Sequence, residues 1–325
     1  MPPAPSPVPA EWSPQLAIYV GFPSHPALWG SDLAPARAEV AAFARQLSAS
    51  VRVRLVCATE EAEAEARRLV AGAPGIETPV LPFGDVWLRD TGPVFTSPAR
   101  AAAFSFNGWG GKYCLPGDAG VADALAAHAG AGLARYDLVF EGGALETDGR
   151  GLGLATEECL LNSNRNPGLS KSDIAAVLRE ALGVWRLVWL SRGLAGDHTD
   201  GHVDNLARFA APGTVLVPVP DGPDDPNAEA YADARARLAA ANLVVLDMPS
   251  PGRVERAGAP VPASYMNFVV SNGQVIAPLY GRPNDATALA ALRRAFPRHR
   301  VSGLRADHLL SGGGSFHCIS QQVPA

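Results

Sequence analysis

The chain has 325 residues, including 33 glycines and 29 prolines, so turns must be frequent, and long coiled coils or helical bundles are disfavoured. Because 47% of the residues are apolar and glycine and proline follow no fixed period, collagen-like and disordered linker proteins are excluded too. The net charge is −5, and the sequence has no cluster of basic residues that could bind a phosphate backbone. We therefore expect a globular protein with no nucleic-acid partner.

The sequence carries no visible signal for secretion or for insertion into a membrane. The first dozen residues, MPPAPSPVPAEW, contain neither a basic region nor an apolar one, and no apolar run approaches the length of a membrane helix. We therefore expect a cytoplasmic protein without a membrane partner. The sequence does not determine the oligomeric state, and a homo-oligomer is compatible with it.

Helical and strand patterns alternate along the chain. Alanine-rich helical patterns cover residues 33–48, 59–72, 119–129, 172–183, 226–241 and 285–296. Three of these helices have an expected N-cap residue, namely Asp32, Thr59 and Ser170. The short β-branched or aromatic runs between them are VRVRLVC, AAFSF, LVWL, TVLVPV, LVVLDM and SYMNFVV. Asn272 and Gly273 predict a two-residue hairpin before QVIAPLY.

The spacing of these helices suggests a repeat. From the second helix onward, the expected helix starts lie roughly 53 to 60 residues apart. This spacing favours repeated units of two or three strands and one helix in a radial arrangement, although a doubly wound sheet would also alternate. No linker rich in proline and serine divides the chain, so we expect one α/β domain over residues 1–325.

Four segments place polar residues among glycines. They are GDVWLRDTGPVF from Gly84, LVFEGGALETDGRG from Leu138, GDHTDGHVDNLARF from Gly196 and SGGGSFHCISQQ from Ser311. Glycine allows a backbone to approach a ligand closely and to adopt positive φ. We therefore expect these segments to present polar side chains to a pocket.

The third segment places Asp197, His198, Asp200, His202 and Asp204 within eight residues. His198 and His202 have the spacing of a helical zinc pair, but Gly201 and the missing HExxH glutamate argue against a metal. If His202 to Asp204 is extended, the two side chains share one face and place a general acid or base beside an anion. A solvated acidic loop is the alternative interpretation.

The four cysteines form no CxxC pair and no disulfide framework. Cys57, Cys114 and Cys159 are expected to be packing positions. Cys318 differs because it follows three glycines and His317, which favours a nucleophile over an inert buried thiol.

Two acidic residues extend this candidate site. Asp90 is either a turn residue, which caps backbone amides or pairs with Arg89, or a ligand-binding carboxylate. Glu141 is either a buried acid satisfied by the backbone or the orienting partner of a histidine. A thiol, a histidine and several carboxylates suit a planar cation with an electrophilic carbon, and a guanidinium meets this description. A cysteine protease would not need several carboxylates around the scissile group.

The sequence motifs resemble those of the agmatine deiminases, within the wider peptidylarginine deiminase and guanidine-modifying superfamily. The resemblance runs in the family's order from about residue 84 to the C-terminus, and AEWSPQ and FPSHPALW are similar to the family's opening. The motifs are GDVWLRDTGPVF, FSFNGWGGKY, FEGGALETDGRG, TEECLLNSNRNP, GDHTDGHVDNLARF, SYMNFVVSNGQVIAPLYG and GGGSFHCISQQVP.

The resemblance implies a five-bladed, pseudo-symmetric α/β propeller, the pentein fold, with the active site in its central channel. It further implies that Cys318 attacks the guanidinium carbon of agmatine while Asp90 and Asp204 bind the nitrogens. His202 would act as acid and then base, and Glu141 would orient His202 or bind substrate. Trp87 would pack along the alkyl chain. The implied product is N-carbamoylputrescine, which leads to putrescine, and no metal or organic cofactor is implied.

Two alternatives stay open at this point. The chain could deiminate another guanidine, such as free or peptidyl arginine, because the sequence does not identify what recognises the distal amine of agmatine. It could also be a noncatalytic propeller like the ribosome-associated members of the superfamily, although a binding module has no need of the Cys318 thiol.

Overall fold

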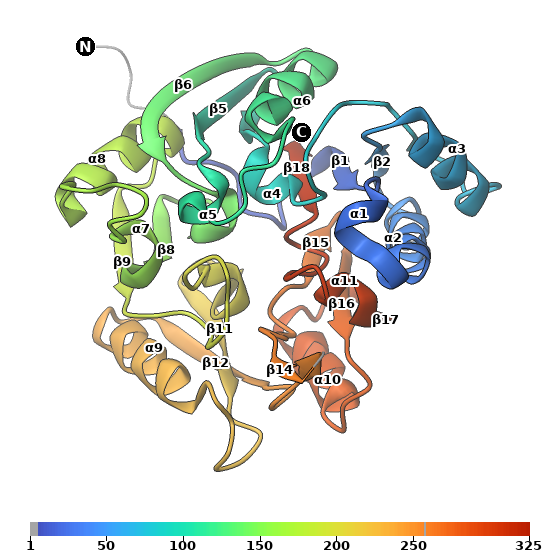
Figure 1. The fold of residues 1–325 in the computed structure, drawn as a ribbon. Helices are drawn as coiled ribbons and strands as arrows, with labels where there is room; N and C mark the ends of the chain where they lie inside the picture. Colours follow the sequence, from blue (N-terminus) through green and yellow to red (C-terminus); the bar gives the residue numbers. More distant parts are fainter. Residues whose placement is uncertain (1–5, 257) are drawn as a thin grey trace.

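The alternating strands and helices form five small sheets that are arranged in a ring (Figure 1). The structure is a computed structural model that describes residues 6–256 and 258–325, so the first five residues of MPPAPSPVPAEW lie outside the described residues. In each of these five sheets one strand pairs antiparallel with the strand before it in the sheet and parallel with the strand after it. The predicted five-bladed propeller is confirmed.

The strands fall into one set for each blade, with an extra hairpin beside the ring. The blades are β18, β1, β2 and β3 (Ser320–Pro324, Gln15–Gly21, Arg52–Val56, Ile76–Glu77); β4, β5 and β6 (Val94–Ser97, Arg100–Ser105, Gly132–Val139); β7, β8 and β9 (Glu146–Thr147, Leu152–Thr156, Arg186–Leu190); β10, β11 and β12 (Arg208–Ala211, Thr214–Val219, Val244–Pro249); and β15, β16 and β17 (Val269–Ser271, Gln274–Leu279, Arg300–Arg305). The extra hairpin is β13 and β14 (Glu255–Arg256, Ala259–Pro260).

The two chain ends close the ring. The last strand, β18, pairs antiparallel with β1 and completes the first blade. In the other blades, the corresponding antiparallel strand comes directly before its partner in the sequence. Figure 1 shows β18 beside β1 although one belongs to the C-terminus and the other to the N-terminus. Residues near both ends of the chain are therefore brought together.

One longer helix links the parallel strands of each blade and lies on the outside of the ring (Figure 1). These helices are α2 (Leu33–Leu47), α6 (Val121–Ala129), α8 (Lys171–Leu182), α9 (Ala228–Ala240) and α10 (Asp285–Ala295), and α3 (Glu60–Leu69) follows β2. Shorter helices occupy the loops: α1 (Pro26–Trp29), η1 (Gly30–Asp32), α4 (Leu88–Thr91), α5 (Gly108–Gly111), η2 (Asp118–Gly120), η3 (Gly142–Ala144), α7 (Glu157–Leu160), η4 (Val203–Asn205) and α11 (Asp307–Leu310).

Side-chain hydrogen bonds at the N-cap positions explain where two of the helices begin. The Thr59 side chain accepts a hydrogen bond from the backbone of Ala62, and Ser170 forms a capping box with Asp173, as their predicted N-cap roles require. Asp32 occupies the N-cap position of α2 but makes no capping hydrogen bond, so that part of the prediction is wrong. Its carboxylate instead contacts His308.

The sheets largely follow the predicted strand runs. Asn272 and Gly273 form the predicted hairpin between β15 and β16, and both have the positive φ that such a turn requires. The run SYMNFVV is only partly a strand because β15 begins at Val269. Residues 264–268, which precede it, form a turn that leads into β15.

The candidate segments share one structural position, immediately before the first strand of a blade. Asp90 precedes β4, Glu141 precedes β7, His202 and Asp204 precede β10, and Cys318 precedes β18. The short helices there are in contact, since α4 touches η3 and η3 touches η4. The ring therefore gathers residues that are far apart in sequence. In the described part of the chain, no helix is both long and apolar enough to cross a membrane.

Candidate active site

A cavity of about 340 Å³ is bordered by both Cys318 and Asp90. Its wall is aromatic, being formed by Trp29, Trp87, Trp109 and Tyr113 among others. Among the described residues that line it, the carboxylates of Asp85 and Asp90 are present but lysine and arginine are not. The cavity is therefore suited to a cation with an apolar portion.

The predicted substrate-packing residue, Trp87, is part of this aromatic wall. Its indole Nε1 donates a 2.8 Å hydrogen bond to Asp85, and the indole of Trp29 donates to the same carboxylate at 3.3 Å. Gly312 and Gly314 pack against the two rings so closely that a Cβ atom would collide with them. Two glycines of the segment before Cys318 are thus required for the close approach of this segment to Trp87.

The thiol of Cys318 is buried at the edge of this cavity. The side-chain amide of Asn267 donates a hydrogen bond to Cys318 Sγ at 3.0 Å, and Asp204 Oδ2 lies 3.7 Å from the sulfur. Burial, together with the carboxylates of Asp204 and Asp90, raises the pKa of the Cys318 thiol well above its ordinary value. The thiol is therefore neutral at pH 7 until a positive charge approaches.

Asp204 presents one bound and one free oxygen. Its Oδ2 accepts a 2.8 Å hydrogen bond from His317 Nδ1, while its Oδ1 is buried without a hydrogen-bond partner among the described residues. Burial acts to raise the pKa of Asp204, but the hydrogen bond and charge of His317 outweigh it and lower the pKa. Asp204 is thus an ionised carboxylate with unused acceptor capacity.

Asp90 is held by two donors from other segments and not by the neighbouring Arg89. Trp109 Nε1 donates to Asp90 Oδ2 at 3.0 Å, and the backbone N–H of Gly143 donates to Asp90 Oδ1 at 3.0 Å. Burial raises the pKa of Asp90 and the charge of His202 opposes that rise. The alternative of an Asp90–Arg89 pair is wrong, since Arg89 instead reaches the backbone oxygen of His317.

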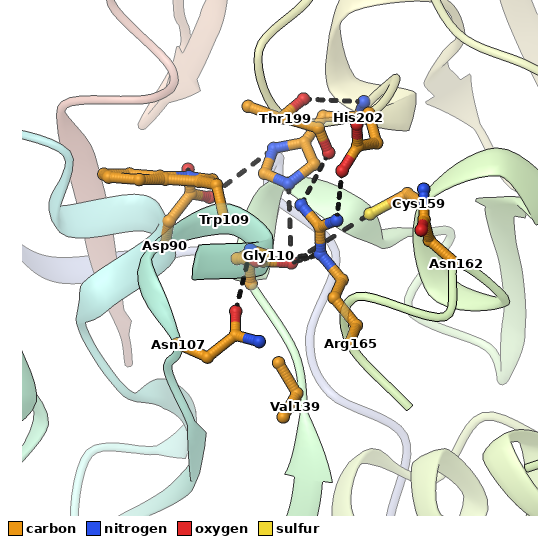
Figure 2. Close-up of polar contacts among 12 residues, drawn as sticks. Asp90, Asn107, Trp109, Gly110, Val139, Cys159, Asn162, Arg165, Thr199 and His202 are labelled. Carbon is orange, nitrogen blue, oxygen red and sulfur yellow. Dashed lines mark hydrogen bonds and ion pairs between the residues drawn. The ribbon is translucent and has the colours of Figure 1, made fainter. Parts of the chain in front are cut away.

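His202 lies between two carboxylates and is fully buried (Figure 2). Its Nδ1 is 3.7 Å from Asp90 Oδ1 and its Nε2 is 3.7 Å from Glu141 Oε2. Burial acts to lower the pKa of His202, but Asp90, Cys159 and Glu141 together raise it well above the ordinary value. The imidazole is therefore protonated at neutral pH and can serve as an acid.

Glu141 supports His202 from the side away from Asp90. Arg165 Nε donates to both oxygens of Glu141 at 3.0 Å, and Cys159 Sγ lies 4.0 Å from Glu141 Oε2. Burial acts to raise the pKa of Glu141, whereas His202 and Arg165 lower it overall. Because Arg165 occupies both oxygens of Glu141, whereas Asp204 keeps one oxygen free within the described part of the chain, the contacts of Glu141 favour the orienting role over direct substrate binding.

The same contacts bear on metal binding. Glu141, Cys159 and His202 offer ligand atoms that all lie within 4.8 Å of one another. The guanidinium of Arg165, however, occupies both oxygens of Glu141 and brings a positive charge to the cluster. The helical zinc spacing of His198 and His202 has no helix to support it, because residues 198–202 form a turn, and His198 lines the cavity whereas His202 does not.

The third segment differs from the expected extended conformation. His202 is followed by the short helix η4, so His202 and Asp204 do not share a strand face. They nevertheless approach a common point beside Gly143, where a Cβ atom would contact both side chains. The remaining acids shape the loop, since Asp197 accepts hydrogen bonds from Thr199 and Asp200 pairs with Lys112.

The other cysteines divide into buried and exposed positions. Cys57 and Cys159 are buried, as expected of packing residues, but Cys114 is exposed, so its assignment to the core is wrong. Cys114 follows the turn at Gly108, where its thiol reaches the backbone oxygen of Asn107. Packing in an apolar core therefore does not account for a cysteine at position 114.

Several residues at the site were missed by the sequence interpretation, namely Asn267, His317, Glu11, Arg165, Trp109 and Asp85. One signal could have identified Asn267: it precedes the first strand of the fifth blade, as the other candidate residues do in theirs. Its side chain also accepts from the backbone N–H groups of His317 and Cys318 at 2.9 and 3.3 Å. It therefore fixes the backbone on which the thiol is carried.

Gly143 lies at the point where three of the candidate side chains meet. A Cβ atom there would be 2.5 Å from His202 Nδ1, 2.9 Å from Asp90 Oδ1 and 3.2 Å from Asp204 Oδ2. Gly143→Ala is therefore expected to lower kcat/KM by roughly 10²-fold through displacement of these groups. We expect overpacking to lower stability by about 1–3 kcal/mol. Steady-state kinetics and thermal unfolding measure the two effects.

Gly120→Ala is the matched control for this substitution. Gly120 has a helical backbone, and a Cβ atom there would meet nothing within 4 Å. Its kinetics should equal those of the parent protein. Unchanged kinetics in Gly143→Ala would contradict the close convergence of His202, Asp90 and Asp204 on this glycine.

Comparisons with known proteins match almost the whole chain. The profile of the family described as Porphyromonas-type peptidyl-arginine deiminase matches residues 7–324. The agmatine deiminase of Stutzerimonas stutzeri is 38% identical over 355 residues, which cover 98% of this chain and 95% of that protein.

Solved structures of agmatine deiminases are also similar to this chain over almost its full length. The agmatine deiminase of Enterococcus faecalis superposes with a TM-score of 0.92 at 30% identity, covering 99% of this chain and 97% of that chain. A substrate-bound structure of the C. jejuni agmatine deiminase has a TM-score of 0.91 at 28% identity, with coverages of 98% and 96%. The similarity therefore includes every blade of the propeller.

Proposed function

The chain belongs to the agmatine deiminases within the Porphyromonas-type peptidyl-arginine deiminase family, and from this premise we propose that it hydrolyses agmatine to N-carbamoylputrescine and ammonia. The observation that carries the proposal is the buried Cys318 thiol facing the carboxylates of Asp204 and Asp90 at a cavity without lysine or arginine among its described lining residues. We also propose that residues 1–325 act as one domain, because β18 pairs with β1.

The guanidinium is bound by the two aspartates. Asp204 Oδ1 is a buried acceptor without a partner in the described structure, and Asp90 lines the cavity. A planar guanidinium offers N–H donors in a fixed geometry that matches such carboxylates. Its positive charge also counters the burial and the negative charges that hold Cys318 in its neutral form. Binding of substrate thus favours the reactive thiolate.

The first chemical step forms a carbon–sulfur bond. As substrate binds, the Cys318 thiol releases its proton to solvent. The thiolate then attacks the guanidinium carbon, the carbon–nitrogen bond to a terminal nitrogen breaks, and His202 supplies the proton with which that nitrogen leaves as ammonia. The product of this step is a thiouronium carried on Cys318. Glu141 keeps His202 protonated and oriented, since its carboxylate is 3.7 Å from the imidazole.

The second step returns the enzyme to its starting state. A water molecule attacks the thiouronium carbon while neutral His202 accepts its proton, and the carbon–sulfur bond breaks as the carbamoyl product forms. The adduct then loses its hydroxyl proton to solvent and the thiolate leaves, so the carbamoyl oxygen comes from water. The thiolate takes up a proton again when the product departs. The sum of both steps consumes one guanidine and one water and produces one ammonia and one ureido product, with no electron transfer.

The cavity wall supports agmatine over arginine as substrate. Trp87 and Trp29 provide an apolar surface for a butyl chain, and Asp85 is the carboxylate that their indoles share. Among the described residues lining the cavity, no lysine or arginine is available to pair with the α-carboxylate of arginine. A negatively charged group would therefore enter this cavity without compensation.

Ammonia release from the purified protein tests the proposal. Agmatine, arginine, a peptidyl arginine and a small alkylguanidine are compared by kcat/KM. We expect agmatine to exceed arginine by at least roughly 10²-fold, because an uncompensated carboxylate is costly to bury. Preference for arginine or peptidyl arginine would reject the substrate assignment while leaving the cysteine mechanism intact. Inactivity toward every guanidine would reject the enzyme function.

A further inference from the structure

A row of buried polar groups runs away from the thiol toward the N-terminal segment. His317 Nδ1 contacts Asp204 Oδ2 at 2.8 Å, and His317 Nε2 contacts Glu11 Oε2 at 2.9 Å. Arg208 then donates to Glu11 Oε2 at 2.7 Å and to Glu146 Oε2 at 3.0 Å. These groups come from both ends of the chain and from two blades between them.

Both ring nitrogens of His317 face carboxylate oxygens. An ionised carboxylate only accepts hydrogen bonds, and a neutral imidazole has a single N–H. His317 contacts a carboxylate oxygen through each ring nitrogen, so both contacts are hydrogen bonds only if both nitrogens carry a proton. His317 thus lies between Asp204 and Glu11, with one ring nitrogen facing each carboxylate.

Glu11 is itself held rigidly. The backbone N–H of Val270 donates to Glu11 Oε1 at 2.6 Å, while Arg208 binds the other oxygen and also donates to the backbone oxygens of Met266 and Phe268 at 3.0 and 2.8 Å. The AEW motif near the N-terminus thus supplies a fixed acceptor behind His317. No part of the proposed reaction otherwise uses this glutamate.

The arrangement has a consequence for Asp204. His317 occupies Oδ2 and thereby fixes the plane of the carboxylate, whereas Oδ1 stays free for a substrate N–H. We propose that His317, backed by Glu11, is a positioning residue that holds Asp204 in the orientation needed to bind the guanidinium. This inference rests on the proposed deimination, and it explains why the residue next to the nucleophile is a histidine.

Two substitutions of His317 separate its two hydrogen bonds. The amide of His317→Asn lies near the position of Nδ1 and can still donate to Asp204, but it does not reach Glu11. The amide of His317→Gln lies near the position of Nε2 and can reach Glu11 but not Asp204. Both variants lose the imidazole and have the same kind of amide, so they are matched in chemistry.

We expect His317→Asn to keep kcat/KM for agmatine within about tenfold of the parent, whereas His317→Gln loses roughly 10–100-fold more, chiefly through a higher KM, because a hydrogen bond to a charged group is removed. The same order should hold for the Kd of agmatine measured by calorimetry in a Cys318→Ser background. Thermal unfolding reports how much each change disturbs the fold.

Equal losses in the Asn and Gln variants would overturn the inference, because a merely structural histidine has no reason to prefer the donor facing Asp204. An inactive parent protein would instead count against deimination itself, so the two failures are distinguishable. If a His317 variant does not fold, Glu11→Gln tests the same arrangement from the other side. It should raise KM several-fold, and unchanged kinetics there would equally overturn the inference.

Discussion

Cys318→Ala is expected to abolish ammonia release from agmatine, with kcat lower by on the order of 10⁴-fold or more. The reason is that no other thiol takes the position of Cys318 beside Asn267 and Asp204 among the described residues. Without the sulfur, water would have to attack a resonance-stabilised guanidinium directly. Continuous detection of ammonia, with enzyme concentrations high enough to measure a residual rate, provides the test.

Cys57→Ala is the control for this substitution. Cys57 is also a buried cysteine, but it belongs to the first blade and does not border the cavity. Its kcat should be close to that of the parent. Ammonia release by Cys318→Ala at more than a few per cent of the parent rate would contradict covalent catalysis through this residue.

Alkylation of the thiol gives a second measurement of the same prediction. Because burial and two carboxylates raise the pKa of Cys318, alkylation of the free protein should be slow at pH 7 and should accelerate as the pH rises. A bound guanidinium that does not react should shift this acceleration to lower pH. An identical pH profile with and without the analogue would contradict ionisation assisted by substrate.

Much of the fold could be predicted from local sequence. The long helices are amphipathic and are separated by β-branched runs, and both signals depend only on neighbouring residues. In α2, for example, Ala36, Val40, Phe43 and Leu47 recur at helical spacing and are all buried. The regular distance between helices then predicted the repeat, because each blade uses one helix to join its parallel strands.

The site was predictable to the extent that its motifs are local. Asp90, Glu141, His202 and Cys318 each lie in a glycine-containing segment, and the structure brings these segments together before the first strands of their blades. Local patterns could not predict which side chains of these segments contact one another. The extended geometry expected for His202 to Asp204 failed because Gly143, from another blade, packs against both side chains while η4 turns the chain.

Glu11 and Asn267 illustrate the same limit. Glu11 and His317 are separated by 306 positions, so only closure of the ring by β1 and β18 places them in contact. Asn267 lies in a run of apolar and aromatic residues that resembles a strand, and its amide function becomes evident only when Cys318 is adjacent. Long-range contacts of this kind depend on tertiary structure and leave little trace in composition or periodicity.

His202→Asn is expected to lower kcat for agmatine by roughly 10²–10⁴-fold, because the asparagine cannot give a proton to the leaving ammonia or take one from water. Asparagine is close to the imidazole in size and can still approach Asp90, so the fold should be largely retained. His308→Asn is the matched control, since His308 is partly exposed and pairs with Asp32 away from the cavity. Its kinetics should not change.

The pH dependence of kcat distinguishes the acid role of His202 from a structural one. Burial alone would lower the pKa of His202, but Asp90, Cys159 and Glu141 raise it well above the ordinary value, so the imidazolium persists at neutral pH. A group needed in its protonated form supports activity below its pKa, and that activity is lost as the pH rises through it. The alkaline decline of kcat should therefore be present in the parent and absent in His202→Asn. If the variant keeps the same alkaline decline, another group donates the proton.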